Sequence, residues 1–202
     1  MPTKQKQPTP FELRFNAPYC EYVYIGEYHE GKAIARIDER NQELFCHIGF
    51  DGKPAYRWRY KAVNDFVEGL AAVTVTNDLG YHIQHNGEPA YKEQFTFVNS
   101  FKEGLARVRT GKEMYHIRHD GTPAYPDRFE SVSDFEEGLA VVTTFDGLDY
   151  HIRHDGKPAY DPKRFKVVST FNNGRAWVNY IEGGYTHCGY IDHHGNLIRD
   201  EE

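Results

Sequence analysis

Apolar and polar residues alternate along several short segments of the chain, a pattern that predicts half-buried β-strands. The clearest segments read Tyr-His-Ile-Arg-His or a close variant, with one isoleucine between polar neighbours. This isoleucine recurs as Ile48, Ile83, Ile117, Ile152 and Ile191. Since alternate side chains of a strand point to opposite faces, we expect each isoleucine to face the core and the adjacent histidines and arginines to face water.

Two further strings recur at a regular spacing along the same chain. The string Gly-x-Pro-Ala-Tyr begins at Gly52, Gly87, Gly121 and Gly156, so its period is 34 or 35 residues. The string aromatic-x-x-Gly-x-Ala occurs five times, beginning at Tyr28, Phe66, Phe101, Phe135 and Phe171. Self-similarity at a fixed period of this length indicates a tandem-repeat protein in which each unit covers the apolar side of its neighbour.

The repeat also predicts how the chain is divided. Five complete units start near residues 22, 60, 95, 129 and 165. We expect residues 1–15, which are polar and proline-rich, to form a flexible N-terminal segment. Residues 16–198 then form a single repeat domain, and residues 199–202 form an acidic tail.

Each isoleucine segment ends at Asp-Gly or Asn-Gly, except where the last unit departs from the pattern. These dipeptides between strand-like runs predict a tight hairpin with a type I′ turn, in which both central residues have positive φ. A proline follows two residues after the glycine, at Pro54, Pro89, Pro123 and Pro158. Because proline has no N–H to donate, we expect this arm to begin at a sheet edge or to be irregular.

The repeated string Phe-x-Glu-Gly-Leu-Ala-x-Val and the last unit, Cys-Gly-Tyr-Ile-Asp-His-His-Gly from Cys188, resemble the bacterial WG repeats. The resemblance extends from about Tyr22 to Ile198. It implies an all-β tandem-repeat protein of unknown or interaction-type function, without shared catalytic residues. Such units can stack as an open, solenoid-like array or close into a five-bladed β-propeller. The unit length of 34 to 38 residues favours the open array, since propeller blades typically need about 40 to 50 residues.

Composition excludes several classes of function. Thirty acidic residues against 24 basic ones give a net charge of −6, which argues against a general nucleic-acid binder. No apolar run approaches the roughly 20 residues that cross a bilayer, and the N-terminus has no apolar signal core. Three widely spaced cysteines fit a reducing compartment. We therefore predict a cytoplasmic protein with no nucleic-acid or membrane partner.

No catalytic motif is present, so we expect no catalytic residues, no cofactor and no metal. Histidines three residues apart, such as His82 and His85, point to opposite faces of a strand and cannot both ligate one ion without a bulge. A ladder of histidines between units stays open as an alternative. The C-terminal cluster lacks the paired spacing of structural zinc sites. An ordinary edge strand is the favoured interpretation of this cluster, and a zinc site is the alternative. The cluster consists of His187, Cys188, His193 and His194.

The candidate site is a row of polar residues on the predicted solvent face. It consists of His82, Gln84, His116, Arg118, His151 and Arg153. Such a row can recognise an acidic or aromatic partner through charge-assisted hydrogen bonds and stacking, although a plain solvated face is the competing interpretation. We therefore predict a non-enzymatic scaffold that binds another protein.

The sequence leaves two alternatives open. The first is a carbohydrate-binding module, which would require exposed rings in shallow pockets at Tyr56, Tyr91, Tyr125 and Tyr160. The second is a pH-responsive surface, since the chain has 11 histidines and unperturbed histidine titrates near neutrality.

Overall fold

The computed structural model describes residues 22–39, 42–75 and 77–198. Apart from one 3-10 turn, η1 (Pro162–Arg164), every regular element in this part of the chain is a β-strand. The all-β prediction is therefore confirmed. The predicted flexible segment at residues 1–15 and the acidic tail at residues 199–202 lie outside the described residues.

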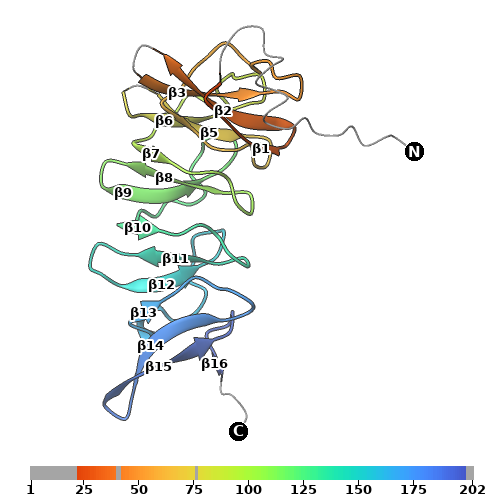
Figure 1. The fold of residues 1–202 in the computed structure, drawn as a ribbon. Coiled ribbons are helices and arrows are strands. Elements are labelled where there is room, and N and C mark those ends of the chain that lie inside the picture. Colours follow the sequence, from red (N-terminus) through yellow and green to blue (C-terminus); the bar gives the residue numbers. More distant parts are fainter. Residues whose placement is uncertain (1–21, 40–41, 76, 199–202) are drawn as a thin grey trace. The chain divides into compact units, whose positions relative to one another are not determined.

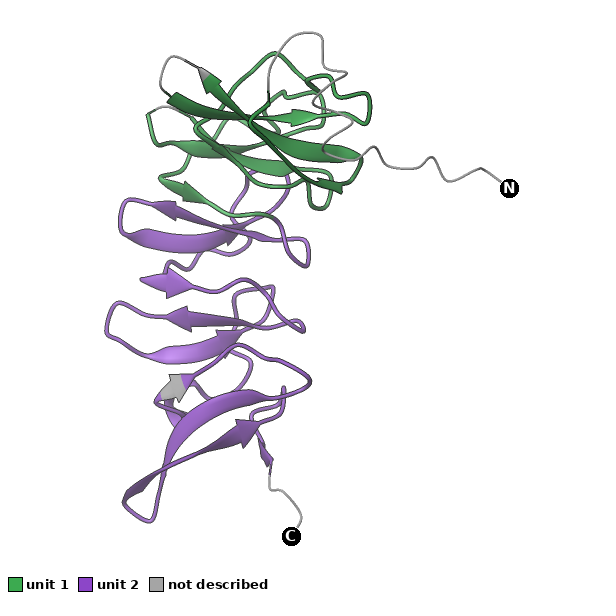
Figure 2. Cartoon of the chain, viewed as in Figure 1, with its two compact units in different colours: residues 1–100 green, residues 101–202 purple. Residues whose placement is uncertain are grey.

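The chain groups into two compact units, residues 1–100 and residues 101–202 (Figure 2). The sequence repeat occurs in both units. A single domain over residues 16–198 stays a prediction.

The first unit contains the earlier strands of the repeat series (Figure 1). These are β1 (Tyr24–His29), β2 (Lys32–Glu39), β3 (Gln42–Ile48), β4 (Ala62–Val63), β5 (Ala71–Thr74), β6 (Gly80–Ile83) and β7 (Phe97–Val98). Strands β1-β2-β3 form one antiparallel sheet and β4-β5-β6 form the next.

The second unit repeats the same plan (Figure 1). Its strands are β8 (Ala106–Thr110), β9 (Glu113–Ile117), β10 (Ser131–Val132), β11 (Ala140–Thr143), β12 (Asp149–Ile152), β13 (Val167–Val168), β14 (Ala176–Glu182), β15 (Tyr185–Ile191) and β16 (Leu197–Ile198). Strands β8 and β9 form a hairpin, β10-β11-β12 form a three-stranded sheet, and β13-β14-β15-β16 form a four-stranded one. Within each unit the sheets follow one another in chain order, and none of the described sheets closes into a barrel.

Backbone hydrogen bonds join successive repeats at the edge of each sheet. Phe129, the first aromatic residue of the fourth repeat, exchanges two such bonds with Met114 of the third, with N···O distances of 2.8 and 3.0 Å. The next short strand begins two residues later, at Ser131. The first strands of the other sheets begin at Tyr24, Ala62, Phe97 and Val167, in each case two residues after a predicted unit start.

The predicted core isoleucines are confirmed, because Ile48, Ile83, Ile117, Ile152 and Ile191 are all 0% exposed. Each pairs with the alanine of the aromatic-x-x-Gly-x-Ala string on the neighbouring strand, as Ile117 does with Ala106. Phenylalanines of that string, Phe66, Phe101 and Phe135, are also buried. The small alanine opposite a large isoleucine lets a phenylalanine fill the space between layers.

The two kinds of turn differ from the sequence prediction. At Asp120-Gly121 only the glycine has positive φ, at 81°, so the predicted type I′ turn is wrong. The carboxylate of Asp120 accepts a hydrogen bond from the N–H of Thr122 (2.9 Å), which holds the aspartate in an ordinary conformation. Both central residues have positive φ instead at the Glu-Gly turns, for example Glu137 (54°) and Gly138 (83°).

Two glycines with similar φ offer a matched test of close packing between repeats. A Cβ at Gly156 (φ 81°) would lie 2.5 Å from Cγ of Tyr125 in the preceding repeat, whereas one at Gly138 (φ 83°) would meet nothing within 4 Å. We expect Gly138→Ala to cost about 1–2 kcal/mol for the left-handed conformation alone. Gly156→Ala adds the clash and should cost roughly 3–4 kcal/mol. Urea unfolding of both variants measures the difference, and equal losses would contradict this packing.

Candidate functional site

The predicted solvent exposure of the histidine row is wrong. His82, His116 and His151 are 0%, 1% and 0% exposed, and His47 at the same position in the first repeat is 0% exposed. An antiparallel sheet commonly has one solvated face, and strand parity placed the histidines on it. In the structure a backbone carbonyl of the following repeat bonds each of these rings, so the histidine is buried as well as the adjacent isoleucine on the opposite face.

Each of these histidines makes one hydrogen bond within its own repeat and one to the next repeat. In His116, Nδ1 lies 2.5 Å from the hydroxyl of Tyr125, and Nε2 lies 2.8 Å from the backbone carbonyl of Ser133 in the next repeat. A carbonyl oxygen only accepts, so Nε2 must carry the proton and donate it. Nδ1 then accepts from the tyrosine O–H. The same pair of bonds recurs at His47, His82 and His151.

Burial keeps these imidazoles uncharged. Removal from water lowers the pKa of His47, His116 and His151 to about 4 in each case. The hydrogen bond to the carbonyl acts in the opposite direction but is the smaller effect. At neutral pH the histidines are therefore structural hydrogen-bonding groups, and they are not available to a partner.

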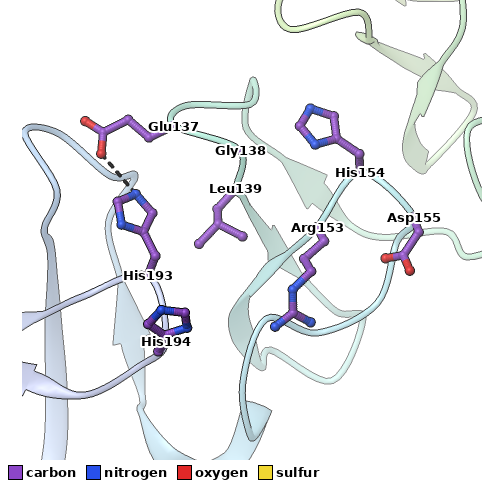
Figure 3. Close-up of a pocket in the computed structure, with 8 residues that line it drawn as sticks. All are labelled: Glu137, Gly138, Leu139, Arg153, His154, Asp155, His193 and His194. Atoms are coloured by element: carbon purple, nitrogen blue, oxygen red, sulfur yellow. Dashed lines mark ion pairs between the residues drawn. The ribbon is translucent and has the colours of Figure 1, made fainter.

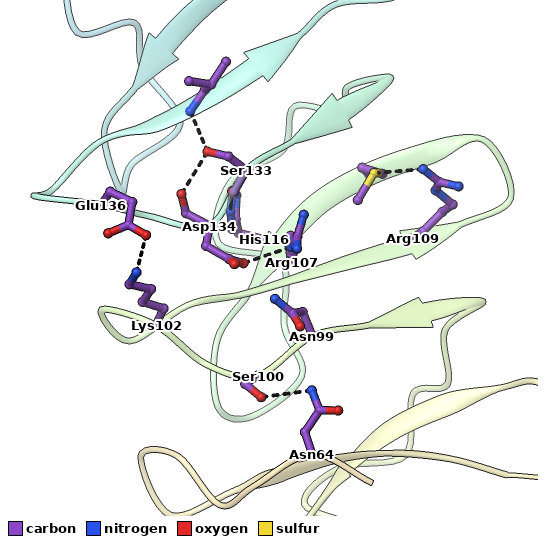
Figure 4. A network of polar contacts seen from close by, with 12 residues as sticks. Asn64, Asn99, Ser100, Lys102, Arg107, Arg109, His116, Ser133, Asp134 and Glu136 are labelled. Atoms are coloured by element: carbon purple, nitrogen blue, oxygen red, sulfur yellow. Dashed lines mark hydrogen bonds and ion pairs between the residues drawn. The ribbon is translucent and has the colours of Figure 1, made fainter. Parts of the chain in front are cut away.

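The acceptor at this junction is itself held in place (Figure 4). The hydroxyl of Ser133 donates to the carbonyl of Asp134 (2.8 Å) and accepts from the N–H of Val141 (2.9 Å). Asp134 also pairs with Arg107 of the preceding repeat, with Nε and Oδ1 2.9 Å apart. The polar network thus fixes the carbonyl that receives the proton of the buried histidine.

The tyrosines of the Gly-x-Pro-Ala-Tyr string make hydrogen bonds inside the protein. Tyr56 and Tyr125 are buried, and Tyr91 and Tyr160 are half-buried. Their hydroxyls bond the histidines, and burial raises the pKa of Tyr125 above its usual value. These rings therefore do not form the exposed stacking platforms that a carbohydrate site would need.

A second row of histidines lies at the repeat edge, next to the Glu-Gly turns. Their rings stack on the phenylalanines of the same repeats at centroid distances of 4.0 to 4.3 Å. The pairs are Phe66–His85, Phe101–His119, Phe135–His154 and Phe171–His193. Each phenylalanine of this row thus presents one apolar face to a half-exposed imidazole.

Glutamates of the Glu-Gly turns connect these edges from one repeat to the next. The carboxylate of Glu137 accepts from the N–H of Gly174 (2.9 Å) and lies 3.0 Å from Nε2 of His193 (Figure 3). Glu103 bonds Gly138 and His154 in the same way, at 2.9 and 3.4 Å. These bonds offset the conformational cost of a glutamate with positive φ.

Two equivalent grooves open between successive repeats of the second unit. One is lined by Glu103, Gly104, Leu105, Arg118, His119, Asp120, Ala124, His154 and Asp155. The other is lined by Glu137, Gly138, Leu139, Arg153, His154, Asp155, His193 and His194 (Figure 3). Corresponding residues line both, and His154 and Asp155 belong to both, so the grooves are contiguous.

The remaining members of the predicted row are exposed. Gln84, Arg118 and Arg153 each follow the core isoleucine of their strand, where the chain leaves the strand and enters the Asp-Gly or Asn-Gly turn. Arg118 and Arg153 line the two grooves. Their role in binding a partner stays a prediction. Sequence parity did not reveal the grooves, because they form only where residues of successive repeats meet.

No group of three or more histidine, cysteine or acidic side chains within the described ranges is arranged to hold a metal. In the C-terminal cluster, Cys188 and His187 are exposed on β15, whereas His193 pairs with Glu137.

Comparison with known families identifies the repeat. The family described as "WG containing repeat" matches residues 83–113 and 117–147. Two adjacent segments of the chain therefore match WG repeats. The two matched segments each run from the core isoleucine of one repeat through the second strand of the next, and the described sheets outside them follow the same plan.

No curated protein matches the sequence of this chain. Among solved structures it is similar to the WD40 β-propeller domain of Doa1, with 13% identity and a TM-score of 0.39. That match covers 91% of this chain and 66% of the Doa1 chain. In the described part of the protein, no helix is both long and apolar enough to cross a membrane.

Proposed function

We propose that this WG-repeat protein is a non-enzymatic scaffold that binds an extended segment of another protein. The supporting observation is the pair of contiguous grooves, which are both lined by a Glu-Gly-Leu segment and by an Arg-His-Asp segment of the same repeat. A ligand that repeats along its own length matches such a surface better than a compact small molecule does.

An extended polypeptide has a suitable geometry. Packed sheets lie about 10 Å apart, and an extended chain advances roughly 3.3 Å per residue, so about three residues correspond to one repeat. Each groove is lined by an arginine and histidines, and the edge of a largely buried leucine, Leu105 or Leu139, lies beside them. Apolar contact together with a few polar groups is the usual composition of a recognition surface.

The carbohydrate alternative is less well supported. Tyr56 and Tyr125 are buried, and the Tyr91 and Tyr160 hydroxyls are bonded to buried histidines. A scaffold role also agrees with the repeat architecture, because stacked repeats typically present extended binding surfaces.

Selection and crosslinking test this function. A display library of random unstructured peptides is selected on the full chain, and the bound peptide is then mapped with a photo-crosslinking residue at position 194. His194 lines one groove, and Phe145, which is exposed and lines neither groove, is the control position. We expect crosslinks from position 194 and not from position 145. Failure to enrich any peptide, or crosslinks only from position 145, would argue against the proposal.

A further inference from the structure

The sheet of the fifth repeat has one buried face and one exposed face. Strands β14, β15 and β16 (blue in Figure 1) bury the face that carries Val178 and Ile191, which are both 0% exposed. Strand alternation and pairing place four large apolar side chains on the opposite face, where they are 40 to 56% exposed. These side chains, which we call the open face, are Trp177, Ile181, Tyr190 and Ile198.

In an earlier repeat the corresponding face is covered by one segment of seven residues, Phe129–Phe135. The backbone of Phe129 exchanges two hydrogen bonds with Met114 of the preceding repeat. The carbonyl of Ser133 accepts from Nε2 of His116, and the ring of Phe135 lies 4.7 Å from that imidazole. The segment therefore makes one contact with the sheet edge and two with the histidine.

The segments that cover a preceding repeat share one sequence pattern. Each has an aromatic residue first, valine three positions later, asparagine or serine after the valine, and phenylalanine six positions after the first residue. These covering segments are Tyr60–Phe66, Phe95–Phe101, Phe129–Phe135 and Phe165–Phe171. The first of them makes the same three contacts, with Phe45 and His47. The chemistry that covers this face is thus constant along the chain.

The edge of β15 beside the open face has free backbone groups. Cys188 lies three residues before the core isoleucine, the position that Met114 holds in its repeat. Opposite Cys188 in the sheet is Asn179, whose carbonyl accepts from the N–H of Lys166 on the other side of β14. Opposite residues of antiparallel strands either bond each other or both point away, so the N–H and C=O of Cys188 point away from β14. Strand β16 pairs with β15 only farther along, so no strand in the described part of the chain bonds them.

Tyr190 occupies the place of the buried histidine. Its hydroxyl can donate to a carbonyl, as the histidine Nε2 does in the earlier repeats. Its ring meets that of Trp177 edge-on at 5.2 Å, whereas the corresponding pair in the second repeat is Ala72 and His82. The fifth repeat therefore combines a larger aromatic surface with an open strand edge, and such a combination suits the addition of a strand from another chain.

We propose that the open face binds an extended segment of a partner protein that has the pattern of the covering segments. Its first aromatic residue pairs with the backbone of Cys188, and its phenylalanine six positions later packs on Tyr190. A second copy of this chain has no such segment to offer without unfolding, because the first residues of all four covering segments are only 2 to 3% exposed. No residue of the open face lines the grooves, so this site is separate from the proposed function.

Tryptophan fluorescence of the full chain tests the proposal. The probe is a peptide with the sequence of residues 93–102, which contains one acidic and one basic residue and has no net side-chain charge. The chain has two tryptophans, so Trp58→Phe leaves Trp177 as the reporter of the open face. We expect the peptide to shift this emission to the blue, because it removes the indole from water. In Trp177→Phe the remaining Trp58, which is 48% exposed, should not respond.

Altered peptides and a matched pair of variants test the individual contacts. Alanine at both conserved aromatic positions of the peptide should weaken binding roughly tenfold or more. Methylation of the first aromatic amide removes one backbone hydrogen bond and should weaken it roughly fivefold. Trp177→Ala should also cost roughly tenfold, whereas Trp58→Ala should leave the affinity unchanged. The thermal midpoint of each variant shows that it is folded.

Several results would overturn the proposal. They are a response of Trp58 instead of Trp177, equal binding of the alanine peptide, and no binding up to about 1 mM peptide. Self-association that depends on concentration and disappears in Trp177→Ala would make a second copy the occupant, which also overturns it. Each of these failures leaves the peptide selection at the grooves unaffected, because its crosslinking position, His194, lies outside the open face.

Discussion

Acidification from pH 7 to pH 4.5 is expected to unfold the repeats. The pKa values of His47, His116 and His151 are about 4 in the folded protein, whereas unfolded histidine titrates near 6.5. Between these values the unfolded chain binds more protons, so stability is complete above about pH 6.5 and falls as the pH decreases. Three histidines titrating together correspond to a slope of up to about 4 kcal/mol per pH unit.

Urea unfolding at closely spaced pH values measures this slope. The variant His116→Gln, which keeps a donor and an acceptor at the junction, should reduce the slope by about one proton. Its total stability at pH 7 is a separate quantity and can change in either direction. A stability that stays constant between pH 6.5 and 4.5 would show that the histidines are not buried as neutral groups.

Truncation of Phe135 to alanine should destabilise the protein strongly at any pH. The ring is 1% exposed and lies between two imidazoles, with centroid distances of 4.7 Å to His116 and 4.2 Å to His154. It therefore contacts the buried histidine of the preceding repeat and the edge histidine of its own. Loss of a buried phenylalanine costs roughly 3–5 kcal/mol, because the cavity it leaves is only partly filled by relaxation.

A matched control comes from the same repeat. Phe145 is 58% exposed, so Phe145→Ala should change the free energy of unfolding by no more than about 0.5 kcal/mol. Chemical denaturation of both variants at pH 7 compares them directly. Similar losses for the two substitutions would place Phe135 outside the core.

Much of the fold could be predicted from the sequence because the repeat constrains it. Five isoleucines at one position of a recurring segment predicted a common core face, and all five are buried. Periodicity alone also located the units, since the first strand of each sheet begins two residues after the predicted unit start. These features depend on local sequence patterns, and each repeat contains the whole pattern.

Strand parity could not predict that the face with the histidines is buried. Parity separates the two faces of a strand but does not say whether a neighbouring layer covers the second face. One sequence signal was present: a tyrosine follows nine residues after each of His47, His82, His116 and His151. That constant spacing reflects the hydrogen bond between the two side chains, and it would have indicated a structural role.

The turns and the grooves show two other limits of prediction from the sequence. At Asp120-Gly121 the dipeptide predicted a turn, but the bond from Thr122 to the aspartate carboxylate selected a different type. The grooves combine residues that lie far apart in the sequence, such as Arg118 with His154 and Leu139 with His193. Their composition follows from how the layers stack, which the sequence pattern does not give.

The central claim is that neutral buried histidines form hydrogen bonds from one repeat to the next. Nitrogen-15 NMR of the imidazole of His116 in the full chain tests this most directly, since it distinguishes the two tautomers and the charged form. The bonds to Tyr125 and Ser133 predict a neutral ring with its proton on Nε2 at pH 6. A charged ring at pH 6, or a proton on Nδ1 instead, would contradict the claim.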